Sequence, residues 1–209
     1  NLRTDVAPPT SDLQLTFDGS APSGVSYTSV APPAGVGSKV GTNVADIIGG
    51  NVVKINNYSV INQPDFSVAF WLYYDEDNGY QSLIGTDPNY TNEISGAFNL
   101  FYQGNTSKFM FWTSSPRFLS ASFYYDLPDG MWHHFTLVHS NDISNEVKFY
   151  INGVHHPWTT VASTSHTYAT GQDVYIGFLL ADTDSYIDDV QIFNSKLTDG
   201  EVSALYSTY

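Results

Sequence analysis

The chain has 209 residues and a formal net charge of −14, with 21 acidic and only 7 basic side chains. This surplus of negative charge repels nucleic acid phosphates and anionic lipid surfaces, so neither is expected as a partner. No apolar run reaches the roughly 18 residues of a membrane span, which argues against membrane insertion. The absence of cysteine argues against a small disulfide-stapled module.

The N-terminal segment differs in composition from the rest of the chain. It is polar and contains Pro8 and Pro9, as is typical of a linker or tail, so residues 1–11 are predicted to lie outside the folded unit. Residues 12–209 are predicted to form a single domain, because all-β folds of this size commonly share one core. Hydrophobic residues make up 42% of the chain, which is enough to cover the inner faces of two sheets.

Apolar side chains alternate with other residues along several short segments, and this period of two is typical of β-strands. The segments are residues 68–72, 135–137, 147–151 and 174–178. Turn-forming residues lie between them, at 75–79, 87–89, 104–105, 128–130 and 152–153. The pattern predicts an all-β sandwich or jelly roll, with the first and last strands adjacent in one sheet.

Two local signals predict particular elements. Asn152 and Gly153 favour the positive φ values of a type I′ turn, so residues 147–151 are predicted to pair with residues 154–158 in a hairpin. Thr198 and Glu201 have the spacing of a capping box, and apolar residues follow them at helical intervals. One short helix is therefore predicted at the C-terminus.

Five segments resemble, in order, the motifs of one family. They are residues 65–72 (DFSVAFWL), 130–135 (GMWHHF), 147–153 (VKFYING), 174–177 (VYIG) and 187–194 (IDDVQIFN). Together they resemble the laminin-G-like jelly-roll domains of the concanavalin A-like lectin/glucanase superfamily. The resemblance implies a two-sheet antiparallel β-sandwich with Trp71 and Trp132 in the core. It also implies a carbohydrate or protein ligand and, often, a bound Ca²⁺.

A metal site is predicted around the last strand. Strand alternation places the Asp188 side chain on the same face as Val190 and Ile192, toward the core. An unpaired buried carboxylate is costly, and because basic residues are scarce, Ca²⁺ is the expected counter-ion. Asp18 is the second expected ligand if the terminal strands pair, as the resemblance implies, and Asp184 is a weaker candidate. The alternative is that Asp18 and Asp188 accept hydrogen bonds from backbone N–H groups.

A carbohydrate site is predicted from aromatic and polar residues in loops and strands. A planar ring covers the apolar face of a sugar, while nearby carboxylate and amide groups bond its hydroxyls. The candidate ligand-binding residues are Asp75, Asp77, Asn78, Tyr80, Trp112 and Trp158, with Tyr90, Tyr124 and Tyr125 as further aromatic candidates. The alternative is that these rings fill the sandwich and its rims.

Catalytic signatures are missing from the sequence. A glycanase needs two carboxylates flanking the sugar bond, but the glutamates at 76, 93, 146 and 201 share no segment. The chain is therefore predicted to be a non-catalytic module, secreted or at the cell surface and monomeric as an isolated domain. Its predicted role is Ca²⁺-dependent carbohydrate recognition, as in a lectin or adhesin, and the alternative is a structural or protein-binding spacer stabilised by Ca²⁺.

Overall fold

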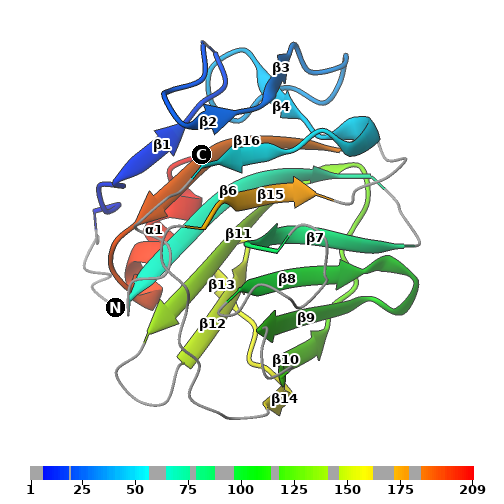
Figure 1. The fold of residues 1–209 in the computed structure, drawn as a ribbon, viewed down its shortest axis with the longest axis vertical. Helices are drawn as coiled ribbons and strands as arrows, with labels where there is room; N and C mark the ends of the chain where they lie inside the picture. The colour runs from blue at the N-terminus through cyan, green and yellow to red at the C-terminus, as the bar shows by residue number, and fades with distance from the viewer. Residues whose placement is uncertain are drawn as a thin grey trace.

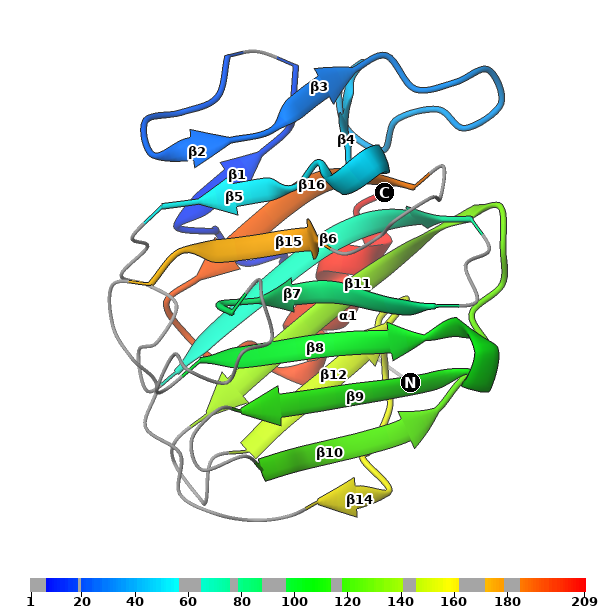
Figure 2. The same cartoon turned by 45° about the vertical axis from the view of Figure 1, so that its right-hand side comes forward.

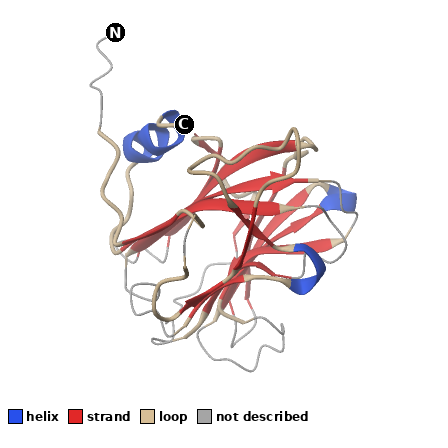
Figure 3. Ribbon diagram, turned by 90° about the horizontal axis from the view of Figure 1, so that it is seen from above, coloured by secondary structure: helices blue, strands red, loops and turns tan. Residues whose placement is uncertain are grey.

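A computed structural model describes residues 7–18, 20–56, 65–75, 79–87, 97–113, 118–140, 146–161, 172–178 and 185–209. These residues form two antiparallel sheets packed face to face, with a helix on the outside of one of them (Figures 1 and 3). The predicted all-β sandwich with one short C-terminal helix is confirmed.

Each sheet has eight strands within the described residues. The first sheet runs in the order β13 (Val154–His155), β12 (Glu146–Ile151), β11 (Met131–Ser140), β6 (Phe66–Tyr74), β16 (Tyr186–Phe193), β4 (Val44–Asp46) and β3 (Thr28–Val30), with β1 (Leu13–Leu15) also paired to β16. The second sheet runs β14 (Thr160–Val161), β10 (Phe118–Tyr124), β9 (Lys108–Thr113), β8 (Phe98–Gln103), β7 (Tyr80–Gly85), β15 (Val174–Phe178), β5 (Val53–Ile55) and β2 (Val25–Ser26). Two short 3₁₀ turns lie between strands: η1 (Ile48–Gly50) between β4 and β5, and η2 (Gly104–Thr106) between β8 and β9.

The core between the sheets follows from the alternation of side chains. Phe70 and Leu72 of β6 point inward and are 1% exposed, and they meet inward-facing rings from the second sheet such as Phe109 and Phe111. Because apolar side chains recur at every second position over most of these strands, the two inner faces pack against each other in one hydrophobic core.

The terminal strands lie side by side, as predicted. Leu13 of β1 pairs with Ile192 of β16, and Leu15 pairs with Val190. Farther along β16, Ile187 pairs with Ala45 of β4. The edge of β16 that faces away from β6 is therefore shared by β4 and β1 (Figure 1).

The predicted hairpin forms, but it is shorter than expected. Asn152 and Gly153 have φ values of 52° and 74°, as a type I′ turn requires. The returning strand β13 ends at His155, and the His156 N–H makes one further bond to β12, to the Phe149 carbonyl at 2.9 Å.

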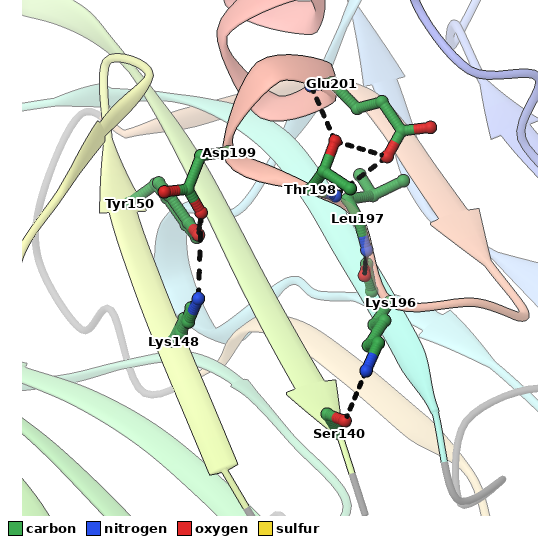
Figure 4. Close-up of polar contacts among 9 residues, drawn as sticks. Ser140, Lys148, Tyr150, Lys196, Leu197, Thr198, Asp199 and Glu201 are labelled. Carbon is green, nitrogen blue, oxygen red and sulfur yellow. Dashed lines mark hydrogen bonds and ion pairs between the residues drawn. The ribbon is translucent and has the colours of Figure 1, made fainter. Parts of the chain in front are cut away.

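The C-terminal helix α1 (Asp199–Ser207) begins with the predicted capping box (Figure 4). The Thr198 hydroxyl accepts a bond from the Glu201 backbone N–H at 3.3 Å, and the Glu201 carboxylate accepts one from the Thr198 N–H at 2.8 Å. Two further contacts join this segment to the first sheet: the Tyr150 hydroxyl donates to Asp199 at 2.7 Å, and Lys196 donates to Ser140 at 3.4 Å. Helix α1 thereby covers a second, smaller apolar cluster on the outer face of this sheet.

Two predicted core residues lie elsewhere. Trp71 is next to the inward-facing Leu72 in β6, and Trp132 is next to His133, which pairs with Leu72. Because side chains alternate along a strand, both tryptophans lie on the outer face of the first sheet and not in the core between the sheets. Trp71 is nevertheless buried, with its ring 5.8 Å from that of Tyr206 in α1. Its role is structural, but it packs against the helix side of the sheet.

Candidate functional site

Residues 36–43, here called the strap, connect β3 to β4 and are held onto the outer face of the first sheet. The Trp132 indole Nε1 donates to the carbonyl oxygens of Val36 and Gly37 at 3.1 and 3.0 Å. The ammonium of Lys39 lies 4.3 Å from the centre of the Trp71 ring, a cation–π contact. Two tryptophans that the sequence assigned to the core therefore fix the strap in place.

Asp188 bonds the middle of the strap. Its carboxylate Oδ2 accepts hydrogen bonds from the backbone N–H groups of Lys39 and Val40 at 2.6 and 2.8 Å, and its Oδ1 accepts one from the N–H of Asp189 at 2.8 Å. The side chain is fully buried. Burial raises the pKa of Asp188 to about 6, although the three N–H bonds act in the opposite direction.

The predicted orientation of Asp188 is wrong. Asp188 pairs with Trp71 and Gln191 pairs with Ala69, so β16 contains one extra residue relative to β6, and this residue forms a β-bulge. Asp189 has a φ of 44° at this bulge. The bulge shifts the alternation by one residue, so Asp188 faces outward although Val190 faces the core.

Asp18 bonds the far end of the strap. Its Oδ1 accepts hydrogen bonds from the N–H groups of Thr42 and Asn43 at 2.7 and 2.8 Å, and these bonds lower the pKa of Asp18. The carboxylate also lies against Gly41, where a Cβ atom would come within 1.5 Å of Oδ2. Asp18 and Asp188 are thus brought to the same loop, as the metal prediction required, but they meet it through backbone N–H groups.

These contacts do not form a calcium site by themselves. The positive ends of the N–H dipoles point at the carboxylate oxygens, and Ca²⁺ needs six to eight oxygen ligands. Among the described residues, no group of three or more His, Cys, Asp or Glu side chains is arranged to hold a metal ion. Asp184 lies outside the described residues. The donor set that is described fits loop anchoring, and calcium binding stays a prediction.

The second sheet carries an exposed row of side chains on its outer face. Tyr80 of β7 pairs with Gln103 of β8, Gln103 pairs with Lys108 of β9, and Lys108 pairs with Tyr124 of β10. The neighbouring residues Tyr102, Phe109 and Phe123 face the core, so the row faces outward. We call Tyr80, Gln103, Lys108 and Tyr124 the platform; it crosses the ends of β7 to β10 that lie beside η2 (Figure 2).

The two aromatic rings of the platform are open to solvent. Tyr80 is 53% exposed and Tyr124 is 68% exposed, the two largest values among the aromatic side chains described. The Lys108 ammonium lies 5.7 Å from the centre of the Tyr124 ring. The next row along the strands, which contains Phe101 and Met110, is buried. Exposed rings that bracket an amide and an ammonium provide both stacking surfaces and hydrogen-bonding groups.

Hydrogen bonds around η2 hold the platform end of the sheet in shape. The Gly104 N–H donates to the Gly79 carbonyl at 3.1 Å, which joins η2 to the residue before Tyr80. On the other side, the Tyr125 N–H donates to the Ser107 carbonyl at 2.8 Å, and the Ser107 hydroxyl donates to Asp126 at 3.1 Å. The flanks of the platform are therefore fixed before any ligand arrives, which reduces the entropy lost on binding.

The other predicted ligand residues are divided among three places. Trp112 lies on the same outer face as the platform, but two rows away, with its ring 4.7 Å from that of Phe101. Trp158 packs against the core, 5.2 Å from the Phe123 ring, and its Nε1 donates to the Val147 carbonyl at 2.6 Å. Asp75 is half-buried just after β6. Asp77, Asn78 and Tyr90 lie outside the described residues.

Gln103 and Lys108 were missed by the sequence prediction. Both flank the turn at Gly104 and Asn105 that the sequence does reveal. Lys108 also alternates with the apolar Phe109, which marks it as outward-facing. The alternation along residues 108–113 is thus the local signal that places Lys108 on the outer face.

A sequence comparison with known families decides the family. The profile of the concanavalin A-like lectin/glucanases superfamily, in its Laminin_G_3 form, matches residues 48–203. The chain belongs to this family. No curated protein sequence matches the chain.

Comparison with solved structures finds the same fold in a domain of an arabinanase and in the binding domains of botulinum neurotoxins. Domain 4 of AbnA, an extracellular arabinanase of Geobacillus stearothermophilus solved in complex with arabinotriose, matches with a TM-score of 0.63 and 18% identity over 93% of this chain and 87% of that one. The ligand-binding domain of botulinum neurotoxin serotype D, solved with N-acetylneuraminic acid, matches with a TM-score of 0.63 and 17% identity over 95% and 50%. The type G receptor-binding domain gives 0.61 and 16% over 96% and 51%. The chain thus spans about half the length of these neurotoxin domains.

Proposed function

We propose that this chain is a non-catalytic carbohydrate-binding module whose ligand lies on the platform. The observation that carries the proposal is the pairing of Tyr80 with Gln103, Lys108 and Tyr124 in one outward row, with both tyrosine rings largely exposed. Large rings are normally placed where they bury area, so two exposed rings at the ends of one ordered row indicate a binding surface.

The family and its structural neighbours support this proposal. Two proteins that share this fold were solved in complex with sugars, one with arabinotriose and one with N-acetylneuraminic acid. A fold does not determine a ligand, so the proposal depends on the platform and not on the likeness alone. The extracellular arabinanase also supports a secreted or cell-surface location. None of the helices described here has the length and hydropathy of a membrane span.

A binding role without catalysis agrees with the use of the carboxylates that are described. Asp18 and Asp188 bond the strap, and Glu201 bonds the start of α1. A glycoside hydrolase needs two carboxylates that are free to face the same sugar bond. These three carboxylates accept bonds from backbone N–H groups and from the hydroxyls of Thr42 and Thr198, and they thereby hold loops and a helix end.

A glycan array tests the proposal. We expect the wild-type chain to bind at least one class of glycan, and we expect the signal to be the same in EDTA and in CaCl₂. The reason is that Asp18 and Asp188 act on the outer face of the first sheet, whereas the platform lies on the second sheet. A blank array with folded protein would favour the spacer role. A signal that disappears in EDTA would instead show that carbohydrate recognition depends on Ca²⁺.

A further inference from the structure

The length of the platform limits the ligands that match it. Neighbouring strands are about 4.8 Å apart, so the three steps from β7 to β10 place Tyr80 and Tyr124 about 14 Å from each other. One unit of an extended sugar chain is roughly as long as one such step. A single sugar can therefore touch only one of the two rings, and a chain is needed to reach both.

The middle of the platform is polar in a way that suits hydroxyl groups. Gln103 offers an amide with both donors and an acceptor, and Lys108 offers an ammonium with three donors. Both side chains are partly buried between the tyrosines, and the contact of Lys108 with the Tyr124 ring keeps its ammonium near the row. Hydroxyls of the inner sugar units have partners there, while the outer units meet rings.

The negative charge of the protein favours neutral glycans over acidic ones as ligands of the platform. The platform contains one cation, and the whole chain has only 7 basic residues against 21 acidic ones. A polyanionic glycan would gain one ion pair at Lys108 but would bring further carboxylates into a strongly negative field. A neutral chain gains the stacking and the hydrogen bonds without this repulsion.

We propose that the platform binds a neutral glycan chain of about four sugar units, which lies across strands β7 to β10. This inference rests on the proposed function. The end units stack on Tyr80 and Tyr124, and the inner units bond to Gln103 and Lys108. The orientation follows from the row itself, which runs perpendicular to the strands.

Calorimetric titration with oligosaccharide ladders tests this inference. The probes are arabino-, xylo- and cello-oligosaccharides of one to six units, and oligogalacturonides of the same lengths as the acidic counterpart. For the neutral series that binds best, we expect affinity to rise up to four units and then to level off. Tyr80→Ala and Tyr124→Ala should each weaken binding of the four-unit chain about tenfold, since one aromatic contact contributes that much.

Matched variants separate stacking from folding. Tyr80→Phe and Tyr124→Phe keep the rings and should keep the affinity. Tyr206→Ala removes a partly exposed tyrosine from α1, over the other sheet, and should leave binding unchanged. Circular dichroism confirms that each variant is folded.

Four results would overturn the inference. Equal affinity for two-unit and four-unit chains, or alanine variants that bind as well as wild type, would show that the platform is not the binding site, while carbohydrate binding itself would still stand. Tighter binding of oligogalacturonides than of every neutral ladder would overturn the neutral class. No binding of any ladder by folded wild-type protein would overturn the proposed function together with this inference.

Discussion

Gly177→Ala is expected to destabilise the fold by about 3 kcal/mol or more, from two separate causes. Gly177 has a φ of 74°, which costs a residue with a Cβ atom strain that glycine does not have. In addition, a Cβ atom at this position would lie 2.6 Å from Ile187 Cδ1 and 3.0 Å from two carbon atoms of Ile47. Both isoleucines are buried in the core, so they have little room to move. Urea unfolding followed by tryptophan fluorescence measures the loss.

Gly49→Ala is the matched control for this change. Gly49 also has a positive φ, 65°, but nothing lies within 4 Å of the position where its Cβ would be. Its substitution should therefore cost only the backbone strain, about 1 kcal/mol. Equal losses for the two variants would show that the close approach of β15 to Ile187 and Ile47 contributes nothing. A stability of Gly177→Ala equal to that of wild type would contradict the placement of β15.

Acidification is expected to destabilise the protein through His134. This side chain is buried on the outer face of the first sheet, with its ring 5.0 Å from that of Trp71 and 6.1 Å from that of Tyr206. Burial lowers its pKa from 6.5 to about 3, so the unfolded chain binds a proton at a pH where the folded chain does not. Stability from this group is complete above pH 6.5 and falls as the pH drops toward 3. The slope is about 1.4 kcal/mol per pH unit.

His134→Leu removes this titration while keeping most of the packing. The free energy of unfolding should therefore fall between pH 7 and pH 4.5 by roughly 3 kcal/mol less in the variant than in wild type. Asp188 titrates with the opposite sign, because its raised pKa favours the folded state as the pH falls, but this contribution is the same in both proteins and cancels. His155→Gln, at an exposed position of β13, is the control for replacing a histidine, and its free energy of unfolding at pH 7 should be close to that of wild type. An identical acid response of His134→Leu and wild type would contradict the assignment.

The sandwich was predictable because its signals are local. Alternating apolar residues gave the long strands, and Asn152 with Gly153 gave the turn of one hairpin. The capping box of Thr198 and Glu201 gave the single helix. Each of these signals acts within a few residues, so the sequence contains the whole physical cause.

The errors arose where distant segments decide the outcome. The alternation around Asp188 failed because the bulge at Asp189 adds one residue, and Asp189 adopts a positive φ that no neighbouring glycine announces. The strap is bonded by Trp132, which lies 96 residues from Val36 in the chain. No local pattern marks such a contact, and the family resemblance instead implies a core position for Trp132.

The platform was only half predicted for the same reason. Tyr80 and Tyr124 are both among the aromatic candidates that the sequence offers, but the row exists only through the register of four strands. Trp158 has the same composition signal as a sugar-stacking residue, yet it packs against Phe123 in the core. Exposure, which separates the two cases, depends on the packing of the sheets and is not written in either residue type.

The most direct test of the account is nuclear magnetic resonance mapping of a bound oligosaccharide on the ¹⁵N-labelled chain. Titration with the neutral oligosaccharide that binds best should shift the amide signals of Tyr80, Gln103, Lys108 and Tyr124, and leave those of the strap, residues 36–43, in place. Shifts confined to the strap, or to the loops around Trp158, with the platform signals unchanged, would contradict the central claim.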